Sequence, residues 1–287
     1  MTDIKLIAMD MDGTLLGQTR GVLPPENLAA LQEAARRGIH LCFASGRAPD
    51  DLSFHAIDAK LDVHILALNG SIILDKPLGA TLHDRPLQPN DARKVYRFIE
   101  EAQIPCAVFC EHDLVLCDPP DYMGARKLQW GTFMDREGGR TRTMMDPAEL
   151  DSRFERVSKF VVSALTEVEK LPPLRRRIEA EIPGVEVTSS WIDNLEINAR
   201  GVNKGSALQL LADSLGIPMT QVMAIGDNDN DISMLRAAGV GVAMGNATPN
   251  AMAAADVVTL PCLENGVAAA VRALALHEDV PGVRWLK

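Results

Sequence analysis

Four short polar clusters hold the residue types that are best suited to chemistry, although they lie far apart in the chain. They supply several carboxylates, a hydroxyl and an ammonium group. Carboxylates that converge without a counter-charge repel one another, whereas a hard cation such as Mg²⁺ prefers oxygen ligands of this kind. If the clusters meet in the fold, they therefore predict a magnesium site. The clusters occupy residues 10–15, 45–47, 203–205 and 226–231.

Two residues of these clusters favour phosphoryl transfer over simple metal storage. Lys204 is unsuited to a metal shell but can bind phosphate as a point charge, and Ser45 can donate a hydrogen bond to a phosphate oxygen. A calcium EF-hand loop needs Gly at its sixth position and Glu at its twelfth. Loops that start at Asp10 or Asp227 have neither. The chain also lacks the Gly-x-x-x-x-Gly-Lys-Ser/Thr phosphate loop.

The hydrophobic pattern predicts the elements that position these clusters. Short buried runs alternate with helical patterns at both ends of the chain, which is typical of βαβ units in a parallel sheet. In such a sheet, ligands bind beyond the carboxyl ends of the strands, and each cluster follows a predicted strand or begins a predicted helix. The expected strands span residues 5–9, 39–44, 64–68, 222–225, 240–244 and 257–260, and the expected helices span 24–37, 204–215, 232–238, 249–255 and 265–276.

The middle of the chain has a different order of elements. An amphipathic helix over residues 90–102 precedes a hairpin pattern, 104–110 with 114–117, and further strands and a helix, 175–182, follow without regular alternation. This pattern predicts a separate α+β module inserted into a parallel core. The predicted fold class is α/β, a doubly wound parallel-sheet core (residues 1–80 plus 196–287) with an inserted α+β domain (residues 81–195).

Charge and composition limit the class of partner. The formal net charge of −10 disfavours nucleic acid, whose phosphates favour a basic face. The five cysteines are irregularly spaced and include no Cys-x-x-Cys pair, so a zinc or thioredoxin-type site is not expected. No apolar run is long enough for a membrane span, and no signal peptide is visible. We therefore expect a cytoplasmic protein with no membrane or nucleic-acid partner.

The polar clusters, taken in this order, resemble the motifs of the haloacid dehalogenase (HAD) superfamily, and specifically of its Cof-type phosphatases. The inserted module resembles the type IIB cap of that family. The resemblance implies a Rossmann-like HAD core, phosphoric monoester hydrolase activity and Mg²⁺ as the cofactor. The matching residues are Asp10-Met11-Asp12-Gly13-Thr14-Leu15, Ser45-Gly46-Arg47, Asn69-Gly70, Lys204-Gly205 and Gly226-Asp227-Asn228-Asp229-Asn230-Asp231.

The same resemblance implies a role for individual residues. Asp10 is expected to be the nucleophile that forms an aspartyl-phosphate, and the side chain of Asp12 is expected to act first as acid and then as base. Ser45 and Lys204 are expected to bind the phosphoryl group. The other expected roles are metal ligation by Asp10, Asp227 and the main-chain carbonyl of Asp12, phosphate contacts from Met11, Gly46 and Asn230, and orientation of these groups by Thr14 and Asp231.

Asp10 and Asp12 need different protonation states in this chemistry. Asp10 must be ionised to attack, which Mg²⁺ and Lys204 favour. Asp12 must carry a proton when the leaving group departs. Because negative neighbours and partial burial favour the protonated form, we expect the pKa of Asp12 to be raised.

The expected function is hydrolysis of a small phosphorylated metabolite, such as a sugar phosphate or a nucleotide or cofactor phosphate. Two alternatives stay open. A phosphomutase of the same superfamily would return the phosphoryl group to its substrate, whereas a non-catalytic signalling module would keep a long-lived phospho-aspartate. Asp12, which is placed to speed turnover of the phosphoenzyme, and the large insert argue against the signalling module. The sequence does not determine the substrate or the oligomeric state.

Overall fold

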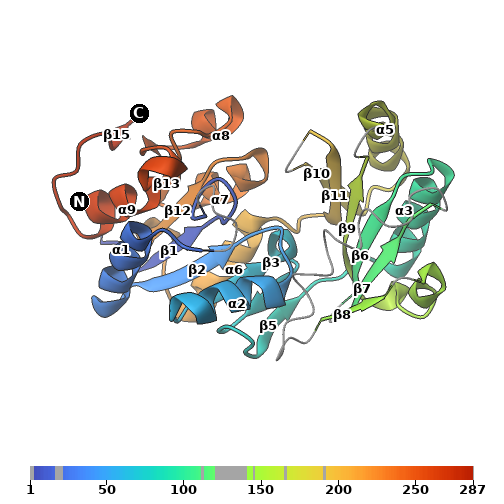
Figure 1. Cartoon of the computed structure of the whole chain (residues 1–287), viewed down its shortest axis with the longest axis horizontal. Coiled ribbons are helices and arrows are strands. Elements are labelled where there is room, and N and C mark those ends of the chain that lie inside the picture. The colour runs from blue at the N-terminus through green and yellow to red at the C-terminus, as the bar shows by residue number, and fades with distance from the viewer. Residues whose placement is uncertain are drawn as a thin grey trace. The chain divides into compact units, whose positions relative to one another are not determined.

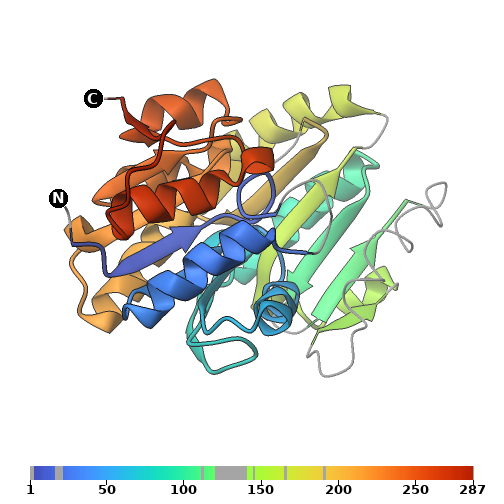
Figure 2. The same ribbon diagram turned by 60° about the vertical axis from the view of Figure 1, so that its left-hand side comes forward.

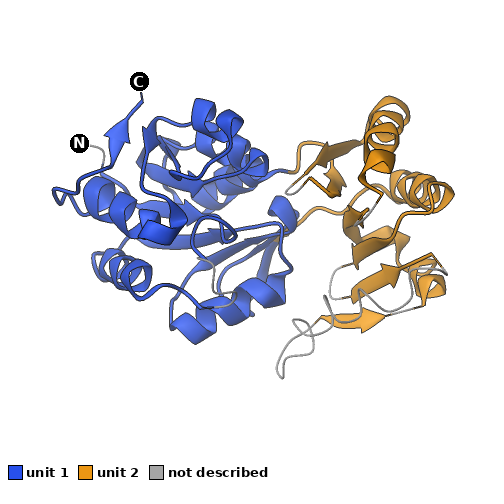
Figure 3. Ribbon diagram, turned by 45° about the horizontal axis from the view of Figure 1, so that its top comes forward, with its two compact units in different colours: residues 1–82, 203–287 blue, residues 83–202 orange. Residues whose placement is uncertain are grey.

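The chain divides into two compact units in the computed structural model, which describes residues 3–16, 22–110, 113–119, 141–144, 146–164, 167–189 and 192–286. Unit 1 contains Met1–Leu82 and Asn203–Lys287, and unit 2 contains His83–Val202 (Figure 3). Unit 1 is thus built from both ends of the chain. Its second segment begins at Asn203 rather than at residue 196, because the strand Asn194–Ala199 belongs to the sheet of unit 2.

Unit 1 is built on a sheet whose central strands are parallel. The strand order is β15-β14-β13-β12-β1-β2-β3-β4-β5, and every pairing from β14 to β3 is parallel (Figure 1). β1 (Leu6–Met9) lies between β2 (His40–Ala44) and β12 (Val222–Gly226), and β1 and β12 are buried along their whole length. The other strands are β3 (His64–Ala67), β4 (Ile72–Leu74), β5 (Thr81–Asp84), β13 (Val240–Ala243), β14 (Val257–Val258) and β15 (Arg284–Trp285).

Helices cover both faces of this sheet, as its buried strands require. On one face, an apolar cluster joins the strands to α6 (Lys204–Leu215), α7 (Ile232–Ala237) and α8 (Pro249–Ala254). On the other face, α1 (Pro25–Arg36) and α9 (Gly266–Ala270) lie side by side (Figure 2). The predicted doubly wound α/β core is therefore confirmed.

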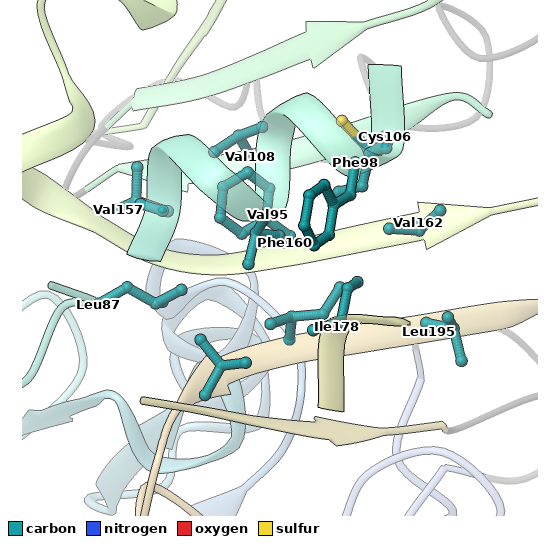
Figure 4. Close-up of a cluster of buried hydrophobic side chains, with 14 of the residues drawn as sticks. Leu87, Val95, Phe98, Cys106, Val108, Val157, Phe160, Val162, Ile178 and Leu195 are labelled. Carbon is teal, nitrogen blue, oxygen red and sulfur yellow. The ribbon is translucent and has the colours of Figure 1, made fainter. Parts of the chain in front are cut away.

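Unit 2 is an α+β module with the strand order β10-β11-β9-β6-β7-β8. Its pairings are antiparallel except that β7 runs parallel to β8. Phe98 of α3 (Pro89–Glu101), Ile178 of α5 (Leu171–Glu181) and Phe160 of β9 belong to one buried apolar cluster (Figure 4). The predicted hairpin is formed by β6 and β7, and residues 111 and 112 of its turn lie outside the described residues. The strands are β6 (Cys106–Cys110), β7 (Asp113–Cys117), β8 (Arg142–Met144), β9 (Val157–Ser163), β10 (Val185–Thr188) and β11 (Asn194–Ala199).

Three helices differ from the sequence-based expectation. The sequence pattern does not predict α2 (Pro49–Ala59), because this helix buries polar and apolar residues together and shows no single apolar face. α5 begins at Leu171 rather than at residue 175, since its prolines lie in the first turn, where a missing N–H costs no hydrogen bond. α9 ends at Ala270, and residues 271–275 continue as a π-helix. In the part of the chain that the structure describes, no helix is both long and apolar enough to cross a membrane.

Candidate active site

Three of the four predicted clusters meet directly at the carboxyl edge of the unit 1 sheet. Because β12, β1 and β2 are parallel neighbours, the residues that follow them lie side by side. Asp10 follows β1, Ser45 follows β2 and Asp227 follows β12, and all three are buried. The amide of Asp10 donates to the carbonyl oxygen of Ile225 at 3.0 Å, which fixes this aspartate beside β12.

Lys204 joins the remaining cluster, residues 203–205, to the others. Its side chain is fully buried, and Nζ donates to Asp10 Oδ1 at 2.6 Å and to Asp231 Oδ1 at 2.5 Å. α6 begins at Lys204 because Asn203 and Ser206 form a capping box, in which each side chain accepts from the main-chain amide of the other. The cap holds Lys204 in the first turn of α6, from which its ammonium group reaches both carboxylates.

The acidic loop after β12 is held in place by hydrogen bonds. Asp231 Oδ2 accepts from the main-chain amides of Asp227 at 2.9 Å and Asn228 at 3.0 Å. Thr14 Oγ1 donates to Asp227 Oδ1 at 2.6 Å and so links the first cluster to the fourth. Both oxygens of Asp231 therefore contact donors within the protein, one on its own loop and one on Lys204.

The electrostatics of this site fit a divalent cation. Carboxylate oxygens of Asp10, Asp227 and Asp231 all lie within 4.8 Å of one another. Burial raises the pKa of Asp10 well above its usual value; Lys204 opposes the rise, whereas Asp231 and Asp227 add to it. Burial also raises the pKa of Asp227 to about 6. Since one ammonium group does not compensate three carboxylates, a hard cation with oxygen ligands suits this donor set.

Two glycines allow close approaches between segments of the site: Gly13 lies against Asp227, and Gly70 lies against the start of α6. Gly13 has a φ of +79°, and a Cβ there would lie 2.5 Å from Asp227 Oδ2. Gly70 has a φ of +99°, and a Cβ there would lie 2.6 Å from the Cβ of Ala207 and 2.8 Å from the carbonyl oxygen of Asn203. Because glycine alone adopts such angles freely and adds no side chain, both contacts depend on it.

Asp12 is paired with an arginine rather than grouped with the buried carboxylates. Arg47 Nε donates to Asp12 Oδ2 and Arg47 Nη2 donates to Asp12 Oδ1, both at 2.7 Å. Partial burial alone would raise the pKa of Asp12, but the hydrogen bonds and charge of Arg47 outweigh it and the pKa is lowered. The expectation of a raised pKa for Asp12 is therefore wrong, because it considered the negative neighbours and partial burial but not this cation.

The remaining predicted residues lie on the same loops. Met11 is fully buried directly after Asp10, and Gly46 is partly exposed directly after Ser45. Asn230 is partly buried in the 3₁₀ turn that follows Asp227. The structure thus places all three next to the cluster, and their contacts with a phosphate remain predictions.

Sequence reasoning missed the residues that hold Arg47. Arg47 Nη1 donates to Asp51 Oδ2 at 2.8 Å and lies 3.1 Å from His55 Nε2. Asp51 and His55 belong to α2, one turn apart, and Arg47 precedes Asp51 by the same spacing. This repeated four-residue spacing of chemically complementary side chains is the signal that the sequence contained.

Asn246 is a second residue that sequence reasoning missed. Its Nδ2 donates to the carbonyl oxygen of Gly13 at 2.9 Å, and its Oδ1 accepts from the amide of Cys262 at 2.8 Å. Asn246 therefore ties the loop of Asp10 and Asp12 to the loop after β13. No spacing in the sequence indicates this link, because it joins three distant segments.

Comparisons with known proteins show what the chain is similar to. A family model for haloacid dehalogenase-like hydrolases matches residues 7–271. The chain is 32% identical over 272 residues to the 5-amino-6-(5-phospho-D-ribitylamino)uracil phosphatase of Bacillus subtilis (strain 168), with 94% of this chain and 95% of the relative covered. It is also 32% identical over 257 residues to the pyridoxal phosphate phosphatase of Escherichia coli (strain K12), with 88% and 92% covered.

A solved structure extends the comparison to the fold. The chain matches a HAD subclass IIB sugar phosphatase with a TM-score of 0.78, and the match covers 95% of this chain and 99% of that chain. The coverage includes the inserted α+β module as well as the parallel core, so the predicted type IIB cap fold is confirmed. Because the identity is 24%, this likeness is evidence for the fold alone.

Proposed function

Because the chain belongs to the family of haloacid dehalogenase-like hydrolases, we propose that it is a Mg²⁺-dependent phosphatase that hydrolyses a small phosphate ester through a phosphorylated Asp10. The observation that carries this proposal is the buried ammonium group of Lys204 between Asp10 and Asp231. A preorganised cation beside a nucleophilic carboxylate stabilises the negative charge of a phosphoryl group during transfer.

In the proposed first step, Asp10 attacks the phosphorus of the ester. One carboxylate oxygen of Asp10 forms the new O–P bond while the P–O bond to the leaving group breaks. Asp12 gives its proton to the leaving oxygen, which departs as an alcohol. Lys204 and the hydroxyl of Ser45 donate hydrogen bonds to the phosphoryl oxygens. Further donors are the main-chain amides of Met11 and Gly46 and the side chain of Asn230.

In the proposed second step, water displaces Asp10 from phosphorus. Asp12 is now a carboxylate and removes a proton from the water, whose oxygen forms the new P–O bond as the bond from phosphorus to Asp10 breaks. Inorganic phosphate is the product, and both aspartates return to their starting states. The lowered pKa of Asp12 beside Arg47 suits this step, which needs a carboxylate, and opposes the first step, which needs the protonated form.

We assign Mg²⁺ to Asp10, Asp227 and the main-chain carbonyl of Asp12. The bound ion would neutralise negative charge on the carboxylates and the phosphoryl oxygens. In the protein, Thr14 orients Asp227 through its 2.6 Å hydrogen bond, and Asp231 orients the ammonium group of Lys204.

The proposed substrate class is a sugar phosphate or a nucleotide or cofactor phosphate. Two relatives of equal identity are named for different esters, a phosphorylated ribitylaminouracil and pyridoxal phosphate. Both compounds join a phosphate to a small polar molecule. This shared chemistry supports the class of substrate rather than either compound.

A phosphate-release screen tests the function. The purified chain is incubated with a panel of metabolite phosphates and with p-nitrophenyl phosphate, with Mg²⁺ and after chelation. We expect release with Mg²⁺, little after chelation and none with Asp10→Asn. Asp213→Asn is the matched control, because Asp213 is exposed on α6 and contacts Gln209 rather than the site. Absence of release across the panel, or an isomerised substrate without net phosphate release, would contradict the proposal.

A further inference from the structure

The pair formed by Asp12 and Arg47 has a fixed geometry. The two hydrogen bonds use both oxygens of the carboxylate and two nitrogens of the guanidinium, each at 2.7 Å. This bidentate arrangement fixes the plane of the carboxylate as well as its position, which a single hydrogen bond does not do. The side chain of Asp12 is 48% exposed and that of Arg47 is 22% exposed. A half-exposed carboxylate is thus held by a more deeply buried cation.

Two side chains of α2 contact Arg47 in turn. Its third nitrogen, Nη1, donates to Asp51 Oδ2 at 2.8 Å and lies 3.1 Å from His55 Nε2. The side chains of Asp51 and His55 are only 15% and 8% exposed. Because Nη1 is a donor, Nε2 of His55 faces it as an acceptor in a neutral ring. Burial lowers the pKa of His55, Asp51 opposes this, and the charge of Arg47 lowers it further, which favours that neutral ring.

The main chain of Arg47 contacts Ser45, within its own cluster, and the residue that follows β3. Its amide donates to Ser45 Oγ at 3.3 Å, and its carbonyl oxygen accepts from the amide of Leu68 at 3.0 Å. Arg47 therefore contacts the loop of Asp12, the residue after β2, the helix α2 and the residue after β3. These contacts make it a junction between the first cluster and the elements beside it.

We propose that Arg47 is a positioning residue that holds the carboxyl group of Asp12 in its productive orientation, and that Asp51 and His55 hold Arg47 in turn. The inference rests on the proposed phosphatase function and adds three residues to it. Arg47 acts through Asp12, which exchanges a proton with the leaving oxygen and then with water. The bonds at phosphorus are made and broken at Asp10, where Arg47 has no role in this proposal.

Leaving groups separate positioning of Asp12 from general damage to the site. An alkoxide leaves as an alcohol only when it receives a proton, so an alkyl phosphate depends on Asp12. p-Nitrophenolate is a stable anion and leaves without a proton, so p-nitrophenyl phosphate depends on Asp12 far less in the first step. Loss of the Asp12 orientation therefore slows the alkyl ester selectively, whereas a collapsed site slows both esters.

The experiment compares Arg47→Gln and Arg47→Lys with the wild type on both kinds of ester. The alkyl phosphate is the best one from the release screen. For each ester, kcat and KM are measured, and single-turnover rates of ester cleavage are measured at saturating substrate. Arg37→Gln is the matched control. Arg37 pairs with Glu33 and the carbonyl oxygen of Leu276 where α1 leads into the amino end of β2, opposite the carboxyl edge.

For Arg47→Gln, the expected cleavage rate with the alkyl ester falls by about 10-fold to 100-fold, the size of effect that misplacement of a catalytic group produces. The expected fall with p-nitrophenyl phosphate is less than about 3-fold, because that leaving group needs no proton. Arg47→Lys keeps the charge but has no fork to hold both oxygens, so it should lie closer to Arg47→Gln than to the wild type. Arg37→Gln should match the wild type with both esters.

Three results would overturn the inference. Equal losses with both esters would show that Arg47 maintains the site in general. A raised KM with unchanged kcat would show that Arg47 binds substrate directly. Unchanged rates would show that Arg47 has no role.

Asp51→Asn and His55→Gln provide a second test. We expect smaller losses of the cleavage rate for these variants, again confined to the alkyl ester. If the wild type itself releases no phosphate while Arg37→Gln and wild type remain folded, the proposed phosphatase function fails, and the inference fails with it.

Discussion

The apolar cluster of unit 2 and the carboxyl edge of the unit 1 sheet bury different kinds of side chain, although unit 1 has an apolar cluster of its own. Beneath α3 and α5, unit 2 buries an apolar cluster that includes Phe160 and Ile178. At the carboxyl edge of its sheet, unit 1 instead buries Asp10, Lys204 and Asp231 against one another. Burial of apolar side chains stabilises a fold, whereas burial of charged groups carries a desolvation penalty. The comparison teaches that the site in unit 1 is arranged for chemistry at some cost in stability, and that the apolar cluster of unit 2 is arranged for stability.

The largest expected effect is on activity, from Asp10→Asn. We expect kcat to fall at least about 1000-fold, which corresponds to about 4 kcal/mol of transition-state stabilisation. Because the change removes a buried carboxylate whose pKa is raised, the free energy of unfolding should change by no more than about 1 kcal/mol. Phosphate release and urea unfolding of the same preparation measure both. A large loss of stability would break the comparison, since the site would then also be a main stabilising element.

Phe160→Ala should instead lower stability strongly. A fully buried phenylalanine in a packed cluster leaves a cavity, and the free energy of unfolding should fall by about 3–5 kcal/mol. Urea unfolding measures the loss. Ile178→Val removes one methyl group from the same cluster and should lower it by only about 0.5–1.5 kcal/mol. Equal effects of the two substitutions would mean that packing does not set the stability of unit 2.

Gly70→Ala should affect stability and activity together, because Gly70 packs where Lys204 is positioned. The strain at φ +99° and the contacts with Ala207 and Asn203 should lower the free energy of unfolding by about 2–4 kcal/mol. Phosphate release should fall as well. The matched control is Gly38→Ala, since Gly38 has a φ of +80° but nothing within 4 Å of its would-be Cβ. If the two variants lose equal stability, the close approach at Gly70 has no energetic consequence.

Among the effects that test the site itself, the smallest expected one is stabilisation by the metal. At a Mg²⁺ concentration about 100 times its Kd, binding should raise the free energy of unfolding by about 2–3 kcal/mol. The gain should disappear in Asp227→Asn and persist in Asp213→Asn. Thermal unfolding with and without Mg²⁺ measures it. A gain that is unchanged in Asp227→Asn would show that the carboxylates at the sheet edge are not the binding site.

The sequence predicted the arrangement of the core better than the contacts of individual side chains. Asp10, Ser45 and Asp227 could be placed together because parallel strands bring their carboxyl ends to one edge. The pairing of Asp12 with Arg47 could not, because it joins residues 35 apart and depends on side-chain directions that hydrophobic periodicity does not encode. The neglect of this pair also led to the wrong direction for the pKa of Asp12.

The boundary of the inserted module also depends on contacts that a local sequence pattern does not encode. β11 pairs with β10 and β9, so it belongs to unit 2, although the sequence analysis places the start of the second core segment, residue 196, within this strand. Strand pairing of this kind is set by partners far away in the chain. A local pattern therefore locates an element better than it assigns the element to a sheet.

The central claim is that a phosphoryl group is transferred to Asp10. The most direct test is mass spectrometry after rapid acid quenching of the enzyme with p-nitrophenyl phosphate and Mg²⁺. We predict an adduct of one phosphoryl group on the peptide that contains Asp10, accumulating in Asp12→Asn, whose carboxamide cannot accept a proton from water, and absent from Asp10→Asn. An adduct on another residue, or none in Asp12→Asn while p-nitrophenol is released, would contradict the account.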